Sequence, residues 1–270
     1  ARPAHSLSGT TTQWMASVDN ATALFPSTTL YLWEITGTPE AGIVVASSTL
    51  PISGLSMPCD SDILGPACAE QGGTPDLVDS GDNRLLDATW RDGEMWVSAN
   101  ALCEAVESYA CPALIQIDTD SLNVLQDFTI TFGAGADAFY PAIRTDEDGN
   151  LVVVVSISSP GEYVGAPVTV VLPGGSLTSY VVMKEGEMPY EPALDSEPYR
   201  WGDYMGAAVD PDDPSTIWVV GQYAKDDGAV GWGTWISSVQ VQPGAPTPTA
   251  TPEPSGGLAG DVDCSGGVNS

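Results

Sequence analysis

A pattern of paired strands recurs along the chain. Segments 85–100, 140–158 and 205–224 each begin as a strand with small residues, pass through an acidic turn with Gly or Pro, and continue as a strand rich in Val, Ile or Trp. A fainter copy pairs residues 12–19 with residues 28–37. Asp before Gly accepts the positive φ that a tight hairpin needs. The pattern therefore predicts one β-hairpin, repeated four times.

Further β-forming stretches follow the hairpins and can add outer strands to them. They are GIVVASSTLPIS, PALIQIDTDSLNVLQDFTITF, APVTVVLPGGSLTSYVVMK and GTWISSVQV. A hairpin with two outer strands, repeated about every fifty residues, is typical of the blades of a β-propeller. A β-sandwich, the alternative, explains the strands but not the recurrence of one hairpin. The predicted fold class is all-β, with a β-propeller-like domain over residues 1–241.

The number of blades follows from the length of this domain. At about fifty residues a blade it holds four or five blades, whereas most propellers close with six to eight. We therefore expect an incomplete, arc-like propeller whose upstream blades are missing from this sequence. An uncovered blade face or strand edge is expected on its N-terminal side.

Three motifs carry a family resemblance. They are GDNRLLDATWRDGEMWV, AFYPAIRTDEDGNLVV and RWGDYMGAAVDPDDPSTIWVVGQYA. With the rest of residues 1–241 they resemble secreted bacterial propeller proteins related to the sialidase-like superfamily. The resemblance implies a fold and export, but it identifies no activity.

The composition changes after this domain. Residues 242–258 are rich in Pro and Thr, which predicts an extended linker. Residues 259–270 contain GDVDCSGGVNS, which fits the first ten positions of an EF-hand-type calcium loop. The predicted oxygen ligands are Asp261, Asp263, Ser265, the carbonyl of Gly267, and Asn269.

The same stretch resembles the start of a type I dockerin repeat. The acidic residue expected at position twelve of the loop and the helix after it are absent, so the calcium site is expected to be incomplete. The resemblance implies that a complete dockerin attaches the protein to a cohesin-type partner. A flexible Gly- and Asp-containing tail is the alternative interpretation.

Charge excludes several classes of partner. The chain has 36 acidic and 7 basic residues, with a net charge of −29. Such a field repels nucleic-acid phosphates and anionic lipid surfaces, so we expect no nucleic-acid partner. No apolar run approaches the roughly 18 residues of a membrane span, so we expect no membrane insertion.

The cysteines indicate the compartment. Cys59 and Cys68 form one close pair, and Cys103 and Cys111 form another, whereas Cys264 stands alone. The chain has no CxxC motif and a single histidine, so two local disulfides in an oxidising compartment are favoured over a zinc site. We therefore expect an extracellular or cell-surface protein.

Arginines supply the candidate ligand-binding residues. Arg84, Arg144 and Arg200 lie in or before the repeated hairpins, and sialidases hold a substrate carboxylate with three arginines on neighbouring blades. Asp82 and Asp203 are candidates for the same site. The alternative is that these carboxylates simply neutralise the arginines beside them. The Asp-box repeats typical of sialidases are absent.

Catalytic residues are not identifiable from the sequence. A glycoside hydrolase needs two carboxyl groups about 5–10 Å apart, and 36 acidic residues offer too many candidates, Asp87 and Asp137 among them. A Ser-His-Asp triad is nearly excluded, because His5 is the only histidine. Seven aromatic residues either stack on sugars or fill the spaces between blades: Trp90, Trp96, Trp201, Tyr204, Trp218, Trp232 and Trp235.

Two functions remain. One is a secreted β-propeller module that binds a glycan or a protein and is presented through a dockerin. The other is a secreted, sialidase-like glycoside hydrolase whose catalytic residues lie partly in the missing blades.

Overall fold

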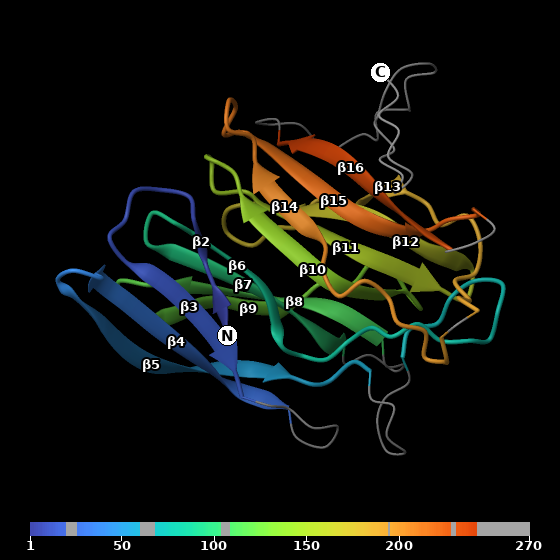
Figure 1. The fold of residues 1–270 in the computed structure, drawn as a ribbon, viewed down its shortest axis with the longest axis horizontal. Coiled ribbons are helices and arrows are strands. Elements are labelled where there is room, and N and C mark those ends of the chain that lie inside the picture. Colours follow the sequence, from blue (N-terminus) through green and yellow to red (C-terminus); the bar gives the residue numbers. More distant parts are fainter. Residues whose placement is uncertain (20–25, 60–67, 104–108, 194, 228–230, 242–270) are drawn as a thin grey trace.

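The chain folds into four antiparallel sheets that are stacked in chain order. The computed structural model describes residues 1–19, 26–59, 68–103, 109–193, 195–227 and 231–241. Figure 1 shows the stack running from the blue sheet through green to orange, so each sheet packs on the sheets before and after it in the sequence. The described residues form no helix, and hence none long and apolar enough to cross a membrane.

The first two sheets share the N-terminal segment. Sheet 1 has the order β1 (Arg2–Pro3), β3 (Gln13–Val18), β4 (Ser27–Thr38) and β5 (Gly42–Leu55). Sheet 2 has the order β2 (His5–Ser6), β6 (Leu85–Arg91), β7 (Glu94–Cys103), β8 (Tyr109–Asp118) and β9 (Asn123–Thr129). β2 runs parallel to β6, and all other neighbours in the four sheets are antiparallel. Residues 2–6 therefore cover the inner edges of both sheets.

The last two sheets are simple meanders. Sheet 3 has the order β10 (Asp137–Thr145), β11 (Leu151–Ser159), β12 (Glu162–Val171) and β13 (Val181–Lys184). Sheet 4 has the order β14 (Gly206–Val209), β15 (Thr216–Ala224) and β16 (Trp232–Gln240). The predicted hairpins are present in all four sheets. Asp92 and Gly93 take the positive φ values, 49° and 93°, that the β6–β7 turn requires.

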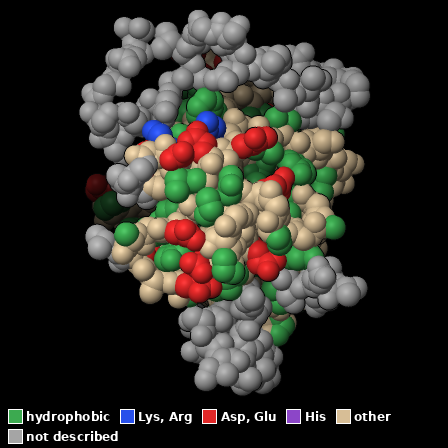
Figure 2. Space-filling view, turned by 90° about the vertical axis from the view of Figure 1, so that its right-hand side faces the viewer, with side chains coloured by type: hydrophobic (Ala, Val, Ile, Leu, Met, Phe, Trp, Pro, Cys, Tyr) green, Lys and Arg blue, Asp and Glu red, His purple; other side chains and the backbone are tan. Residues whose placement is uncertain are grey.

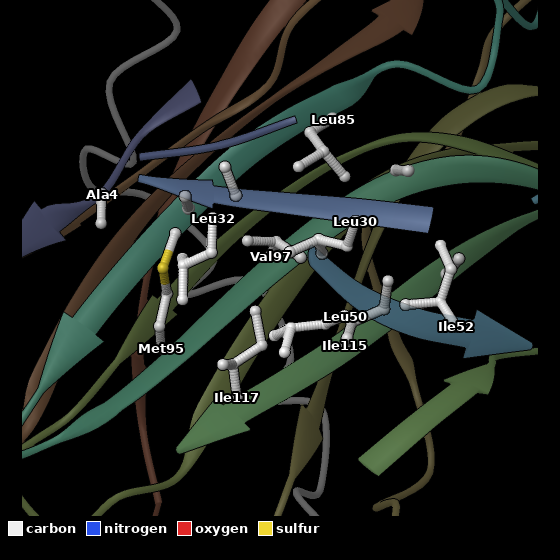
Figure 3. Close-up of a cluster of buried hydrophobic side chains, with 14 of the residues drawn as sticks. Ala4, Leu30, Leu32, Leu50, Ile52, Leu85, Met95, Val97, Ile115 and Ile117 are labelled. Carbon is white, nitrogen blue, oxygen red and sulfur yellow. The ribbon is translucent and has the colours of Figure 1, made fainter. Parts of the chain in front are cut away.

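Apolar layers fill the spaces between consecutive sheets. Figure 3 shows the first layer, where Leu30, Leu32 and Leu50 of sheet 1 face Val97 and Ile115 of sheet 2. Each sheet is thus held by side chains from the next, as in the blades of a propeller.

β11 lies at the centre of the stack. Val153 and Val155 pack toward sheet 2, whereas Val152 and Val154 pack toward sheet 4, and all four are fully buried. A strand that is buried on both faces needs a continuous apolar run rather than alternation. The run LVVVV meets this need.

The stack does not close into a ring. Sheets 1 and 4 do not pack face to face in the described part of the chain. Their outer faces are uncovered: Tyr31 and Val45 of sheet 1 are 36% and 58% exposed, and Trp218 of sheet 4 is 44% exposed. The prediction of an incomplete propeller is confirmed, with four blades. The second uncovered face, on sheet 4, was not predicted.

Two leucines on adjacent strands test the packing between sheets. Leu114 of β8 is fully buried between sheets 2 and 3, whereas Leu125 of β9 is 48% exposed. We expect Leu114→Ala to lower the free energy of unfolding by about 2–5 kcal/mol, because it leaves a cavity in a dense layer. Leu125→Ala should change it by less than about 0.5 kcal/mol. Urea denaturation measures both, and equal losses would contradict the stacked arrangement.

Candidate binding site at the hub

A cavity of about 690 Å³ lies where sheets 1, 2 and 3 meet the segment that precedes sheet 4. We call it the hub cavity. It is lined by Arg2 of β1, by the end of β3, by residues 79–86 at the start of β6, by Asn100 and Tyr140 of β7 and β10, and by residues 198–204 before β14. Its volume is typical of ligand pockets. The stacking of the sheets therefore creates a pocket from segments far apart in the sequence.

Basic residues are concentrated at this cavity. The chain has only seven, and three of them, Arg2, Arg84 and Arg200, line it. Elsewhere acidic side chains prevail: in Figure 2 they are spread over the face in view, where few basic side chains are seen. Among the described lining residues the acids are Asp79, Asp82 and Asp203. The cavity thus balances charges within a chain of net charge −29.

Two of the arginines are held by neighbouring carboxylates. The Nε of Arg84 donates to Oδ2 of Asp82 at 2.6 Å, and Nη2 of Arg200 lies 2.9 and 3.0 Å from the two carboxylate oxygens of Asp203. Both arginine side chains stay open to solvent, 79% and 65% exposed. Pairing positions each guanidinium and leaves other N–H groups facing outward.

Arg2 connects the two ends of the arc. Its Nε donates to the carbonyl of Leu85 at 2.8 Å, and its guanidinium carbon lies 4.6 Å from the centroid of the Tyr204 ring. A cation over an aromatic face is attracted by the quadrupole of the ring. Sheet 1 therefore contacts the segment before sheet 4 at the hub.

Tyr140 holds a strained backbone conformation inside the cavity. Its φ is 55°, at an irregularity of β10 between Phe139 and Ala142. A bulky residue at positive φ is an outlier that persists only when its surroundings impose it, and such outliers gather at functional sites. Here the Tyr140 N–H donates to Oδ1 of Asn100 at 2.6 Å.

Gly81 makes room for the Tyr140 ring. Gly81 itself has a φ of 77°, and a Cβ at this position would lie 2.8 Å from the ring of Tyr140. Asn100 is buried and also donates to the carbonyl of Ser80 at 2.9 Å. Burial and then the nearby Asp79 and Asp203 raise the pKa of Tyr140 well above its usual range. The phenol therefore stays protonated and can donate a hydrogen bond to a ligand.

The structure brings together four of the five candidate ligand-binding residues. Arg84, Asp82, Arg200 and Asp203 line the hub cavity. They also form the local ion pairs of the alternative interpretation. Sequence reasoning missed Arg2, Asp79 and Tyr140, whereas Tyr204 was among the aromatic residues considered for stacking on sugars. The positive φ of Tyr140 and the long-range contact of Arg2 leave no signal in the sequence.

Arg144 does not line the cavity. Its side chain is buried, and its Nε and Nη2 donate to the Ala207 carbonyl at 2.9 and 2.7 Å. Asp87 lies 3.6 Å from its Nη2. Arg144 therefore ties β10 to β14, and burial lowers its pKa. The sequence could not distinguish this packing role from ligand binding, because its partner is a backbone carbonyl of the next sheet.

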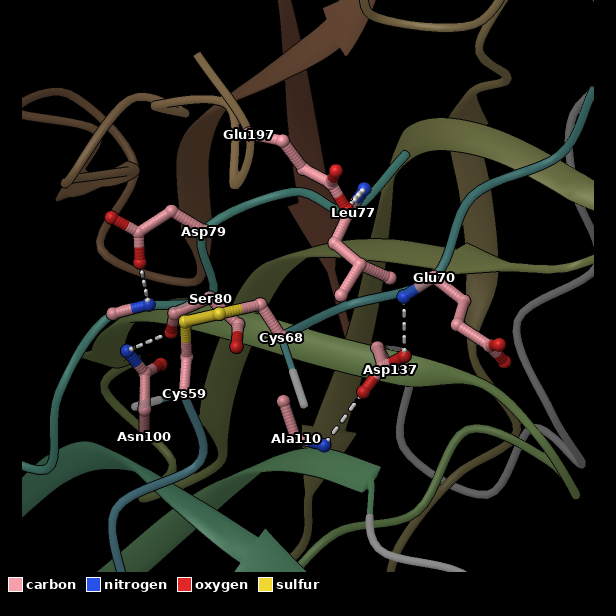
Figure 4. The surroundings of a disulfide bond; sticks show 11 residues. Cys59, Cys68, Glu70, Leu77, Asp79, Ser80, Asn100, Ala110, Asp137 and Glu197 are labelled. Carbon is pink, nitrogen blue, oxygen red and sulfur yellow. Dashed lines mark hydrogen bonds between the residues drawn. A yellow bond between two sulfur atoms is a disulfide. The ribbon is translucent and has the colours of Figure 1, made fainter. Parts of the chain in front are cut away.

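Two disulfides are present in the described part of the chain, and one of them lies at the hub cavity. Cys59 bonds Cys68, and Cys103 bonds Cys111, with Cα atoms 4.5 and 5.7 Å apart. Figure 4 shows the first beside Ser80 and Asn100, and Cys59 itself lines the cavity. Both pairings agree with the sequence-based prediction.

Asp137 links two segments next to the disulfides through hydrogen bonds to their backbone. Its two carboxylate oxygens accept the N–H groups of Ala110 and Glu70 at 2.8 and 3.1 Å (Figure 4). It is 5% exposed, and burial raises its pKa to about 6 against these hydrogen bonds. Asp137 does not line the hub cavity.

No metal site is visible in the described residues. No three His, Cys, Asp or Glu side chains there are grouped to hold a metal ion. The predicted calcium ligands and Cys264 lie in residues 242–270, outside the described part of the chain.

The raised pKa of Asp137 predicts a pH-dependent stability. Its pKa in the folded state, about 6, exceeds the ordinary 3.8, so the folded state holds the proton more tightly. The stability that protonated Asp137 contributes is therefore fully present below pH 3.8 and is lost as pH rises through 6. The difference corresponds to about 3 kcal/mol. The free energy of unfolding of the native chain, measured relative to that of Asp137→Asn, should therefore fall by up to about 3 kcal/mol between acidic and neutral pH.

Thermal or urea unfolding across this range measures the difference. Asp120→Asn removes the same charge from an exposed turn and should not show this pH dependence. A stability gap between the native chain and Asp137→Asn that stays constant with pH would contradict the assignment.

Several solved structures align with most of this chain. No protein-family model and no curated protein matches the sequence. A protein of unknown function from Dyadobacter fermentans DSM 18053 aligns with 86% of this chain and 87% of its own, at 11% identity and a TM-score of 0.39. A thermostable family-43 glycoside hydrolase aligns with 85% of this chain and 75% of its own, at 12% identity and a TM-score of 0.31. A xylan β-1,4-xylosidase from Bacillus halodurans C-125 aligns with 96% of this chain and 44% of its own, at 11% identity and a TM-score of 0.32.

Proposed function

We propose that this chain is a glycan-binding β-propeller module and that its ligand is a neutral sugar held in the hub cavity. The observation that carries the proposal is the balance of charge at the cavity. Three arginines and three aspartates meet there, among the described residues, in a chain that is otherwise strongly acidic.

Sugar hydroxyl groups both donate and accept hydrogen bonds. Carboxylates such as Asp79 and Asp203 can accept from them, and the outward N–H groups of Arg84 and Arg200 can donate to them. Hydrogen bonds to charged groups are stronger than neutral ones. Tyr204, 60% exposed, adds an aromatic ring at the rim. An alternating set of charged donors and acceptors thus suits a polyhydroxylated, uncharged ligand.

An anionic ligand fits this arrangement less well. Arg84 and Arg200 are already paired with carboxylates, so a ligand carboxylate would compete with Asp82 and Asp203. The field of the whole chain also repels anions. The proposed site therefore differs from a site whose arginines bind the carboxylate of an acidic sugar.

The carboxylates at the cavity already have protein partners, and this favours binding of a sugar over its hydrolysis. A glycoside hydrolase needs one carboxyl group to donate a proton and a second to act as a base or nucleophile. At the cavity, Asp82 and Asp203 are ion-paired and Asp79 accepts the N–H of Gly81 at 2.8 Å. We therefore place hydrolysis second, and product analysis after incubation with a bound glycan distinguishes the two.

We propose an extracellular or cell-surface location for the module. Disulfides persist in oxidising compartments, and the described residues contain two. The Pro- and Thr-rich residues 242–258 would separate the propeller from a dockerin, which would dock on a cohesin-type partner.

The calcium proposal for residues 259–270 has its own test. The segment supplies four side-chain ligands at most, and binding would have to order it at about 1–2 kcal/mol per residue. We expect calcium affinity no tighter than about millimolar. Titration calorimetry of this chain and of Asp261→Ala measures it. Micromolar binding that Asp261→Ala abolishes would contradict the expectation.

The glycan proposal predicts a specific effect of one hydroxyl group. Tyr140→Phe keeps the ring in its place and removes only the phenol. If the phenol donates to the ligand, affinity should fall roughly two- to twelvefold, the range of one neutral hydrogen bond. Tyr180→Phe is the matched control, because Tyr180 is 40% exposed and lies outside the cavity.

Calorimetry with a panel of neutral and acidic oligosaccharides first identifies a ligand of the native chain. The affinities of the variants are then measured with that ligand. We expect binding within the neutral group. Preference for uronic or sialic acids, or a neutral ligand whose affinity is unchanged in both Tyr140→Phe and Arg84→Ala, would contradict the proposed site.

A further inference from the structure

The two ends of the arc present uncovered apolar faces. In sheet 1 the side chains at even positions of β3 and β4 pack on sheet 2, so those at odd positions point away. We call this the front face. Its apolar residues are Met15, Tyr31, Trp33, Ile35, Ile43 and Val45.

Sheet 4 has a corresponding back face. Ile217 and Val219 pack on sheet 3, so the even positions of β15 and their partners point away. Its apolar residues are Ala208, Trp218, Val220 and Ile236. Ile43 and Val45 of the front face are 60% and 58% exposed, and Trp218 and Ile236 of the back face are 44% and 41% exposed.

Both faces lack charged residues. Their remaining strand positions are Ser, Thr, Gln, Pro and Gly, together with Ala224 and Trp232, which pack on a buried cluster at the end of the back face. The chain nevertheless has 36 acidic residues. Asp19 and Asp210 lie only at the ends of the strands, and Asp210 accepts the indole N–H of Trp218 at 2.7 Å. Uncharged apolar patches at opposite ends of an acidic molecule mark interaction surfaces.

The structure itself shows what covers such faces. At each of the three junctions within the chain, the back face of one sheet packs on the front face of the next through an apolar layer. The back face of sheet 4 and the front face of sheet 1 are the same kind of pair, but within the described ranges of one molecule they do not pack on each other. A second copy can supply the missing partner.

We propose that copies of this chain associate head to tail, with the front face of one copy packed on the back face of another. The charge distribution supports this mode, because two chains of charge −29 repel except where the surfaces are uncharged. The contact is heterologous, so each dimer keeps one free face of each kind and the series can continue.

Single charges on either face test the proposal. Val45→Glu disables the front face, and Ile236→Glu disables the back face. Val44→Glu is the matched control: Val44 is 62% exposed on the same strand but belongs to the opposite side. Light scattering coupled to size-exclusion chromatography, at salt sufficient to screen the net charge, measures the mass.

We expect the native chain and Val44→Glu to form dimers and larger species as concentration rises. Val45→Glu alone and Ile236→Glu alone should be monomeric. Their equimolar mixture should form a dimer that grows no further, because each variant retains one working face.

Three results would overturn the proposal. The first is a native chain that stays monomeric at high concentration, which is expected if another blade or protein covers both faces. The second is a single variant, Val45→Glu or Ile236→Glu, that still dimerises. The third is a Val44→Glu variant that is as monomeric as Val45→Glu. Circular dichroism of each variant confirms that it is folded before its mass is interpreted.

Discussion

The need to cover both faces of every sheet governs this structure. A sheet whose two faces are apolar cannot stand alone in water, so each sheet packs on its neighbours, and the central strand β11 is buried from both sides. The layers fix the order and direction of the sheets. They also bring the inner strands together at one point, where the hub cavity forms.

The cavity depends on contacts that fix its residues before a ligand arrives. Asn100 accepts the backbone N–H of Tyr140 in its left-handed conformation, and Gly81 leaves room for the ring. Asp82 and Asp203 hold Arg84 and Arg200 at the rim. A site that is positioned by its surroundings loses less conformational entropy on binding, which favours affinity for a rigid, hydroxyl-rich ligand.

Much of the fold follows from the sequence, because hairpins are local. The turn at Asp92-Gly93 and the run LVVVV around Val153 predict strands whose place the structure confirms. The site is less predictable. Arg84 and Arg200 were found because they lie beside the repeated hairpins, whereas Arg144, with the same local pattern, packs on the carbonyl of Ala207.

Long-range contacts explain what the sequence could not supply. Arg2 reaches Leu85 across 83 positions of the chain, and Tyr140 owes its conformation to Asn100 on another sheet. Neither has a periodicity or motif that marks it. Likewise, the uncovered back face of sheet 4 follows from which side of β15 packs on sheet 3, and this depends on the register of the sheets.

The central claim is that the stacked sheets form a ligand site at their hub. Hydrogen–deuterium exchange of the chain, alone and saturated with a neutral oligosaccharide that it binds, tests this claim most directly. The account predicts slower exchange in residues 79–86, around Tyr140, and in residues 198–204, which line the cavity. Slower exchange confined to the outer faces of sheets 1 and 4, with the hub segments unchanged, would contradict it.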